Sequence, residues 1–114
     1  MLGPLADQIE RYMDLLSARQ KLVASNIANV DTPGYHTQDI DFQFEFLSQT
    51  QSGVKSAPDV VDVPGLLIRN DGNDVNLDRE ARLLAENAIR FTLASTLMKG
   101  EIKSIRSAIQ EGKG

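Results

Sequence analysis

Apolar residues recur every seven positions along the first thirty residues of the chain. The repeat comprises Ile9, Leu16, Val23 and Val30, and further apolar residues fall between them. A seven-residue repeat places these side chains on one face of a helix. The pattern predicts a single helix from about Pro4 to the end of the repeat, because proline is tolerated in a first helical turn.

The last third of the chain carries a stricter repeat, in which apolar or small residues follow one another at steps of four and three. Its members are Leu77, Ala81, Leu84, Ala88, Phe91, Ser95, Met98, Ile102, Ile105 and Ile109. A period of 3.5 residues held over nearly five heptads is typical of a coiled coil. Asn76 predicts the N-cap of this helix, Gly112 predicts its end, and Gly100 falls on the face opposite the repeat.

Such a helix is too long for the rest of the chain to enclose. About 34 helical residues span roughly 50 Å, whereas a compact domain of this size has a radius of gyration of only about 13 Å. We expect the terminal helices to pair, and other subunits to cover the apolar surface that remains. The residues predicted to form the helix-packing seam are Ile9, Leu16, Val23, Leu77, Leu84, Phe91, Met98, Ile102, Ile105 and Ile109.

Residues 31–76 differ in composition from both helical stretches, because they hold three of the four prolines and a turn-forming Asn-Asp-Gly-Asn sequence. Within this stretch Ile40, Phe42, Phe44 and Phe46 alternate with polar residues. The alternation predicts a short strand, residues 65–69 predict another, and residues 48–58 predict a polar linker.

The predicted fold is therefore mainly α and forms one domain. Residues 1–30 are the N-terminal assembly helix, residues 31–76 an irregular insert with short strands, and residues 77–114 the C-terminal assembly helix. The two long helices are expected to pair as a coiled-coil-like assembly domain.

Composition and charge exclude several classes of function. The chain has no cysteine and one histidine, so disulfides, thiolate metal sites and sites with several histidines are not expected. The net charge is −4 and only residues 77–114 are mildly basic, which argues against nucleic-acid binding. The N-terminus has neither the basic nor the apolar region of a signal peptide, and no run of about 18 apolar residues predicts a membrane span.

Candidate catalytic and metal-binding residues are few. The acidic stretch after residue 70 does not fit a calcium-binding EF-hand, because Leu67 and Arg69 would stand where oxygen ligands belong. Asp39 and Asp41 are interpreted as surface acids without a basic partner, and His36 as a structural or solvated side chain. No nucleotide-binding or catalytic motif is present, so we expect no enzyme activity, no cofactor and no bound metal.

The sequence ASNIANVDTPGY is the most distinctive part of the chain. Asn26 and Asn29 lie one helical turn apart, so their amides share a face and suit hydrogen bonding to a backbone. Pro33 biases Thr32 away from helical geometry, and Gly34 permits a left-handed turn. The residues leave open whether the two amides bind their own chain's turn or a neighbouring subunit.

This stretch resembles the N-terminal signature of the flagellar axial proteins, the family of rod, hook and hook-filament junction subunits. In that signature a helix ends in two asparagines three apart and is followed by Thr-Pro-Gly-Tyr. It is matched at Asn26, Asn29, Thr32, Pro33, Gly34 and Tyr35. The sequences DIDF and DGNDVNLDREARLLAENAIRF, together with the short chain, resemble the proximal rod subunits of the family.

The resemblance implies a structural subunit of the bacterial flagellar basal body, which assembles with other axial proteins into the rod and transmits torque in motility. It implies export to the extracytoplasmic side by the flagellar type III apparatus, without a cleaved signal peptide. The implied partners are other copies of the chain, FlgC-like and other rod subunits, FliE and the inner-membrane ring.

Phe42 and Phe46 have the spacing of the short Phe-x-x-x-hydrophobic export-gate signal found in subunits of this class, although the packing of a strand explains the same pair. Two alternatives to a proximal rod subunit remain. One is another rod subunit, such as a FlgC-like protein, and the other is a small helical export chaperone or adaptor, which would not need the Asn and Thr-Pro-Gly motif.

Overall fold

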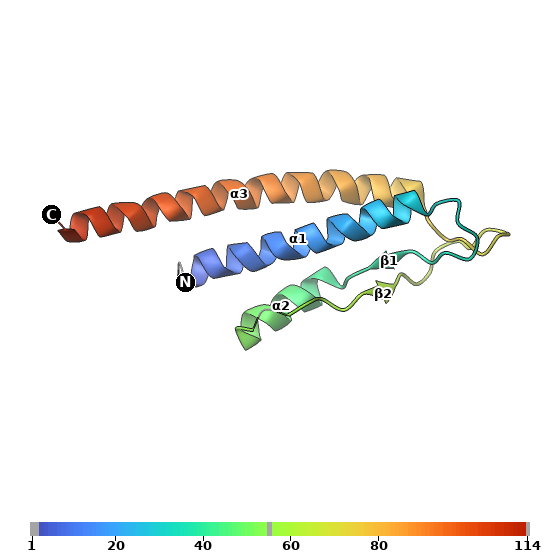
Figure 1. Cartoon of the computed structure of the whole chain (residues 1–114), viewed down its shortest axis with the longest axis horizontal. Coiled ribbons are helices and arrows are strands. Elements are labelled where there is room, and N and C mark those ends of the chain that lie inside the picture. The colour runs from blue at the N-terminus through green and yellow to red at the C-terminus, as the bar shows by residue number, and fades with distance from the viewer. Residues whose placement is uncertain (1–2, 55, 114) are drawn as a thin grey trace.

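Three helices and two short strands make up the computed structural model of the chain, which describes residues 3–54 and 56–113. The elements are α1 (Pro4–Ala28), β1 (Gln38–Asp39), α2 (Phe42–Ser52), β2 (Val61–Asp62) and α3 (Leu77–Lys113). Helices α1 and α3 lie side by side in opposite directions, and α2 and the strands lie along the other side of α1 (Figure 1). The predicted mainly α fold with two paired terminal helices is confirmed.

The molecule is elongated because α3 is long and α1 covers only part of its length. Its extents are 69 × 26 × 17 Å and its radius of gyration is 18.1 Å. Helix α3 has 37 residues and α1 has 25, so the last turns of α3 reach past the start of α1 (Figure 1). No helix among the described residues is long and apolar enough to cross a membrane.

The ends of the long helices follow local side-chain chemistry. Helix α1 ends at Ala28, slightly before the predicted end. The side chain of Asn76 accepts a hydrogen bond from the Arg79 backbone N–H at 3.1 Å, which confirms the predicted N-cap of α3. The prediction that Gly112 ends α3 is wrong, because the helix continues to Lys113. One glycine costs a helix only about 1 kcal/mol.

The strand predicted over residues 40–46 is wrong, because helix α2 begins there. The Asp41 carboxylate caps this helix by accepting a hydrogen bond from the Phe44 backbone N–H at 3.2 Å. Phe42 and Phe46 lie one turn apart and both meet the ring of Tyr12 edge-on, with centroids 5.3 and 5.6 Å away. A helix is the geometry that brings both phenylalanines to one ring and turns Phe44 outward, where it is exposed.

The second predicted strand, over residues 65–69, is also wrong. Strand β2 lies earlier and pairs antiparallel with β1, with Gln38 opposite Asp62. The predicted linker over residues 48–58 is wrong in its first part, because α2 extends to Ser52 and Gln49 within it is buried. Lys55 of that linker lies outside the described residues.

The core lies mainly between α1 and α3 and changes character along their length. Its apolar members are Ala6, Ile9, Leu15, Leu16, Val23, Ile40, Val75, Leu83 and Ala94. Where α1 ends and α3 begins, the buried side chains are mostly polar, and they include Asn26, Thr37, Asp39, Asn73, Asp74 and Glu80. We call this part of the molecule the closed end.

Candidate assembly joint at the closed end

Asn26 is fully buried where α1, β1 and α3 meet. Its amide nitrogen donates to the Gln38 carbonyl at 2.9 Å and to the Glu80 carboxylate at 2.7 Å. Its amide oxygen accepts from the Gln38 N–H at 3.0 Å and from the Tyr35 hydroxyl at 2.9 Å. An asparagine amide has two N–H donors and two acceptor positions, so Asn26 uses all four within its own chain.

Asn29 has a more local role at the end of α1. Its amide nitrogen donates to the Ser25 carbonyl at 2.8 Å, and its amide oxygen accepts from the Thr32 hydroxyl at 3.0 Å. Both bonds lie within the ASNIANVDTPGY stretch. The first gives the Ser25 carbonyl a second donor beside the Asn29 backbone N–H, and the second joins the end of α1 to the turn that follows it. Asn29 therefore shapes the exit of the chain from α1.

A second turn, residues 69–74, supports the Thr-Pro-Gly turn from the other side. Asn73 is fully buried, and its amide nitrogen donates to the carbonyls of Asn29 and Thr32 at 2.8 and 2.9 Å. The Gly34 N–H donates to the Asp71 carbonyl at 2.8 Å. The motif at the end of α1 is thus held by residues about forty positions further along the chain.

The two turns touch at their glycines. This contact predicts which of two glycine substitutions destabilises the folded chain more. Gly34 and Gly72 have φ of +76° and +83°, and a Cβ at Gly72 would lie 3.3 Å from the Gly34 Cα. Gly72→Ala is expected to lower the free energy of unfolding by about 2 kcal/mol, and Gly34→Ala by about 1 kcal/mol, because only the first adds a close contact to the left-handed strain. Urea denaturation of both variants measures this, and equal losses would contradict the contact.

Asp39 lies in a buried ion network that links α1, β1 and α3 at the closed end. Its carboxylate accepts from the Arg19 guanidinium at 2.9 and 3.1 Å and from the Arg79 guanidinium at 2.6 Å. Arg79 also donates to the fully buried Glu80 at 2.7 Å, and Glu80 in turn accepts from Asn26. The interpretation of Asp39 as a surface acid without a basic partner is wrong, because two arginines from different helices enclose it.

We call these five residues, Arg19, Asn26, Asp39, Arg79 and Glu80, the polar joint. Burial raises the pKa of Asp39, but hydrogen bonds from Arg19, the Ile40 backbone N–H and Arg79 outweigh it, so the pKa lies below its usual value. Burial lowers the pKa of Arg79, and the bonds to Glu80 and Asp39 more than reverse this and raise it. The hydrogen bonds of the joint therefore favour the charged forms of Asp39 and Arg79.

Asp74 forms a second acidic anchor beside the joint. It accepts from the Thr37 backbone N–H at 2.6 Å and from the Thr37 hydroxyl at 2.8 Å. The half-exposed His36 lies 3.4 Å from its other carboxylate oxygen. Burial raises the pKa of Asp74, but the bonds from Thr37 and the contact with His36 lower it below its ordinary value. His36 is a partner of this anchor, in keeping with a structural role.

The two lowered carboxylate pKa values predict how stability depends on pH. An acid whose pKa is lower in the folded chain stabilises it above the unfolded pKa of about 4, and this stabilisation is lost as the pH falls through the folded value. We expect the free energy of unfolding to fall below about pH 4, and the fall to be smaller in Asp74→Asn, which has no charge to lose. Thermal unfolding between pH 2.5 and 7 tests this. An unchanged acid dependence would contradict the role of Asp74.

The residues of the predicted packing seam occupy different positions in the single chain. Ile9, Leu16 and Val23 of α1 are buried, and Met98, Ile102 and Ile105 are half-buried. Leu77, Leu84, Phe91 and Ile109 of α3 are between 41% and 53% exposed. Helix α3 contacts α1 through a neighbouring face that includes Leu83, Asn87 and Ala94. The seam as a surface between subunits stays a prediction.

Other predicted site residues are placed as follows. Thr32, Pro33 and Gly34 are exposed in the turn after α1, and Tyr35 reaches back to Asn26. Phe42 and Phe46 are half-buried on Tyr12, so their use as an export-gate signal stays a prediction. Among residues 3–54 and 56–113, no group of three or more acidic or histidine side chains is placed to hold a metal ion.

Sequence reasoning missed Asp39, Asn73, Arg79 and Glu80. One signal was available, because Arg19 and Asn26 are polar residues seven apart within an otherwise apolar helical pattern. Such residues face the interior only when they have partners, and their presence predicts a buried polar cluster. The partner of Arg19 lies 20 positions away in the sequence, and the most distant partner of Asn26 lies 54 positions away.

Comparisons with known proteins agree with this geometry. A family model described as "Flagella basal body rod protein" matches residues 13–36, which include the end of α1 and the Thr-Pro-Gly turn. The flagellar basal body rod protein FlgB of Escherichia coli (strain K12) is 32% identical, with 90% of this chain and 91% of the relative covered. The FlgB proteins of Yersinia enterocolitica and Borrelia hermsii are 33% and 28% identical, with at least 90% of both sequences covered.

These relatives carry the names of structural rod proteins and not of enzymes. The similarity extends over about nine-tenths of the chain and of the relatives, and therefore reaches well beyond the matched motif. The chain therefore belongs to the family of flagellar basal body rod proteins FlgB.

Proposed function

We propose that this chain is a subunit of the proximal rod of a bacterial flagellum, which assembles with other axial subunits and transmits torque. The observation that carries the proposal is the polar joint, which fixes two long helices against each other while much of the apolar surface of α3 stays uncovered. A rigid subunit with apolar helix surfaces suits a load-bearing assembly. The family membership supports the same conclusion.

The joint gives the helix pair a fixed register. Asn26 of α1 bonds Glu80 of α3, and Gln20 of α1 bonds Asn87 of α3 at 3.1 Å. A shift of one residue moves a helix by about 1.5 Å along its axis and would break both bonds. Buried polar pairs of this kind specify register in helical assemblies. A subunit whose helices cannot slide past each other transmits torque without deforming.

We further propose the partners and the location that the family implies. The chain is exported without a cleaved signal peptide by the flagellar type III apparatus and joins the rod on the extracytoplasmic side. There it contacts copies of itself, FlgC-like subunits, FliE and the inner-membrane ring. Because Phe42 and Phe46 are half-buried on Tyr12 in the folded chain, an export-gate signal at this pair is more accessible before the chain folds.

Deletion and complementation test this proposal. Cells that lack the gene are expected to be non-motile and to lack rods, and the wild-type gene is expected to restore both. Purified basal bodies should contain the chain, and antibody labelling should place it at the base of the rod. Normal rods in the deletion strain would overturn the proposal. Neither a FlgC-like subunit nor an export chaperone is favoured, because relatives that cover nine-tenths of the chain are FlgB proteins.

A further inference from the structure

Helix α3 exposes apolar side chains on two flanks, in addition to the face that packs on α1. One group, which we call flank A, consists of Leu77, Ala81, Leu84, Ala88 and Phe91. The other, flank B, consists of Ile89, Leu93 and Leu97. The large residues of flank A are 41–51% exposed, and those of flank B are 61–63% exposed. A single pair of helices leaves both flanks without a partner.

The two flanks lie on opposite sides of the helix. Leu84 and Leu93 are nine residues apart, which is about two and a half turns at 3.6 residues per turn. Their side chains therefore project in opposite directions. The buried residues Leu83, Asn87 and Ala94 face α1 between the two flanks. A neighbour on one flank cannot also cover the other.

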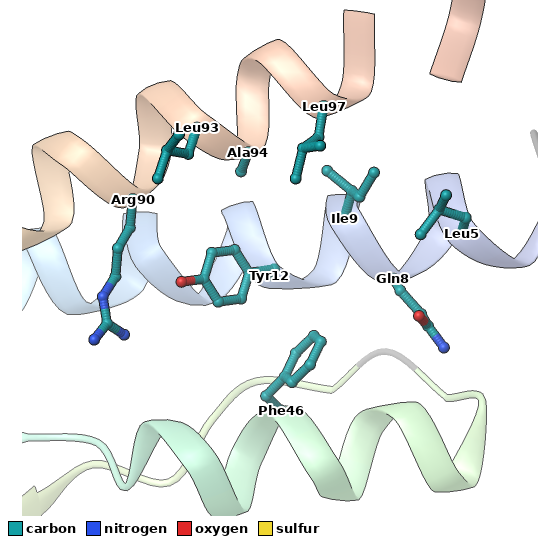
Figure 2. A pocket seen from close by; sticks show the side chains of 9 residues that line it. All are labelled: Leu5, Gln8, Ile9, Tyr12, Phe46, Arg90, Leu93, Ala94 and Leu97. Carbon is teal, nitrogen blue, oxygen red and sulfur yellow. The ribbon is translucent and has the colours of Figure 1, made fainter. Parts of the chain in front are cut away.

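The flanks differ in the sizes of their side chains. Flank A alternates large residues with Ala81 and Ala88, which leave gaps between the larger side chains. Flank B is built from large aliphatic residues four apart, and Leu93 and Leu97 border an apolar groove of about 340 Å³ between the helices. Figure 2 shows these two leucines on α3 above Ile9 of α1, with Phe46 on the far side of the groove. Large residues opposite gaps are the packing of a coiled-coil contact.

Neither flank requires a charged partner. All side chains of flank A are uncharged. Beside flank B, Arg90 forms an ion pair with Glu86 one turn away, at 3.3 Å, so this charge is balanced within the helix. Two such surfaces can approach without repulsion, and burying their aliphatic side chains is favourable by about 1.5–3 kcal/mol for each side chain that becomes fully buried. This balance favours an apolar helix as the occupant of each flank.

We propose that flank A of one copy packs against flank B of a second copy of this chain. The contact is heterologous, which means that each copy contributes a different surface, and both of its flanks become covered when the contact repeats. Copies joined in this way stand side by side and form a wall of α3 helices. The inference rests on the proposed function, because it names the surfaces through which the subunits meet.

Cysteine cross-linking tests the contact, and the chain offers a clean background because it has no cysteine. Ala88→Cys marks flank A, Leu93→Cys marks flank B, and Thr96→Cys marks the outward face as a matched control. After oxidation, a mixture of the two flank variants is expected to give several times more disulfide dimer than either variant alone. The double variant is expected to form a ladder of longer species, because each copy then carries both halves of the contact.

Three results would overturn the proposal. If Ala88→Cys alone gives as much disulfide dimer as the mixture, flank A contacts itself in a symmetric dimer. Thr96→Cys that cross-links equally well would indicate random collision. No dimer in any combination, up to the solubility limit, would place the contact elsewhere. If the chain is nevertheless needed for rods in cells, the proposed function stands and only the assignment of the flanks fails.

Discussion

Asn26→Ala is expected to lower the free energy of unfolding by about 3 kcal/mol. The substitution removes four hydrogen bonds from a fully buried site and leaves the Glu80 carboxylate without one of its two partners. It also leaves the N–H and carbonyl of Gln38 without the amide that pairs with them. Unsatisfied buried groups cost more than the bonds themselves contribute, since water cannot replace the lost partner.

Asn29→Ala is the matched control, because it removes the same type of side chain one helical turn away. Its two bonds are exposed and local, so a loss of about 1 kcal/mol is expected. Urea denaturation followed by circular dichroism measures both variants. In cells, Asn26→Ala is expected to lose folding and rod assembly together. A variant that folds normally but fails to assemble would contradict the internal role of Asn26.

The long helices could be predicted from the sequence because their apolar residues follow a single period over many turns. Helix α2 could not, since Phe42, Phe44 and Phe46 fit a strand and Phe42 and Phe46 also fit a helix. The contacts of both Phe42 and Phe46 with the ring of Tyr12, together with the cap at Asp41, favour the helix. The position of Tyr12 relative to this segment is a property of the folded chain.

The candidate site was predictable in part, because the motif at Asn26 and Asn29 is local but the partners of Asn26 are not. Glu80 lies 54 residues away and belongs to a helix whose period predicts a different contact face. The bonds from Asn26 to Glu80 and from Asn87 to Gln20 set the rotation of α3 about its axis. This rotation leaves the first large residues of the repeat, Leu77, Leu84 and Phe91, exposed beside the face that contacts α1. A period alone therefore predicts that a helix has an apolar stripe, but not which neighbour the stripe contacts.

Arg79→Leu is expected to destabilise the chain by about 3 kcal/mol at pH 7. The guanidinium is the only group of the polar joint that bonds both carboxylates, Asp39 at 2.6 Å and Glu80 at 2.7 Å. Leucine retains apolar volume but leaves two buried carboxylates with one cation fewer between them. Removing one partner of a buried ion pair is costly because the remaining charge is neither hydrated nor neutralised. Arg79→Lys keeps the charge without the planar fork and is expected to lose less.

The loss in Arg79→Leu should itself depend on pH, which distinguishes an electrostatic cause from lost packing. Arg79 helps to lower the pKa of Asp39, so this pKa is expected to rise in the variant. The stabilisation from Asp39 in the wild type is present above about pH 4 and disappears as the pH falls through the folded pKa. The difference in the free energy of unfolding between wild type and variant should therefore be largest near pH 7 and shrink toward pH 3.

Urea denaturation at both pH values measures this difference, with Arg82→Leu on the exposed side of the same helix as control. A difference that stays constant with pH would show that Arg79 contributes by packing alone, and the stability of the polar joint would then come mainly from the hydrogen bonds of Asn26.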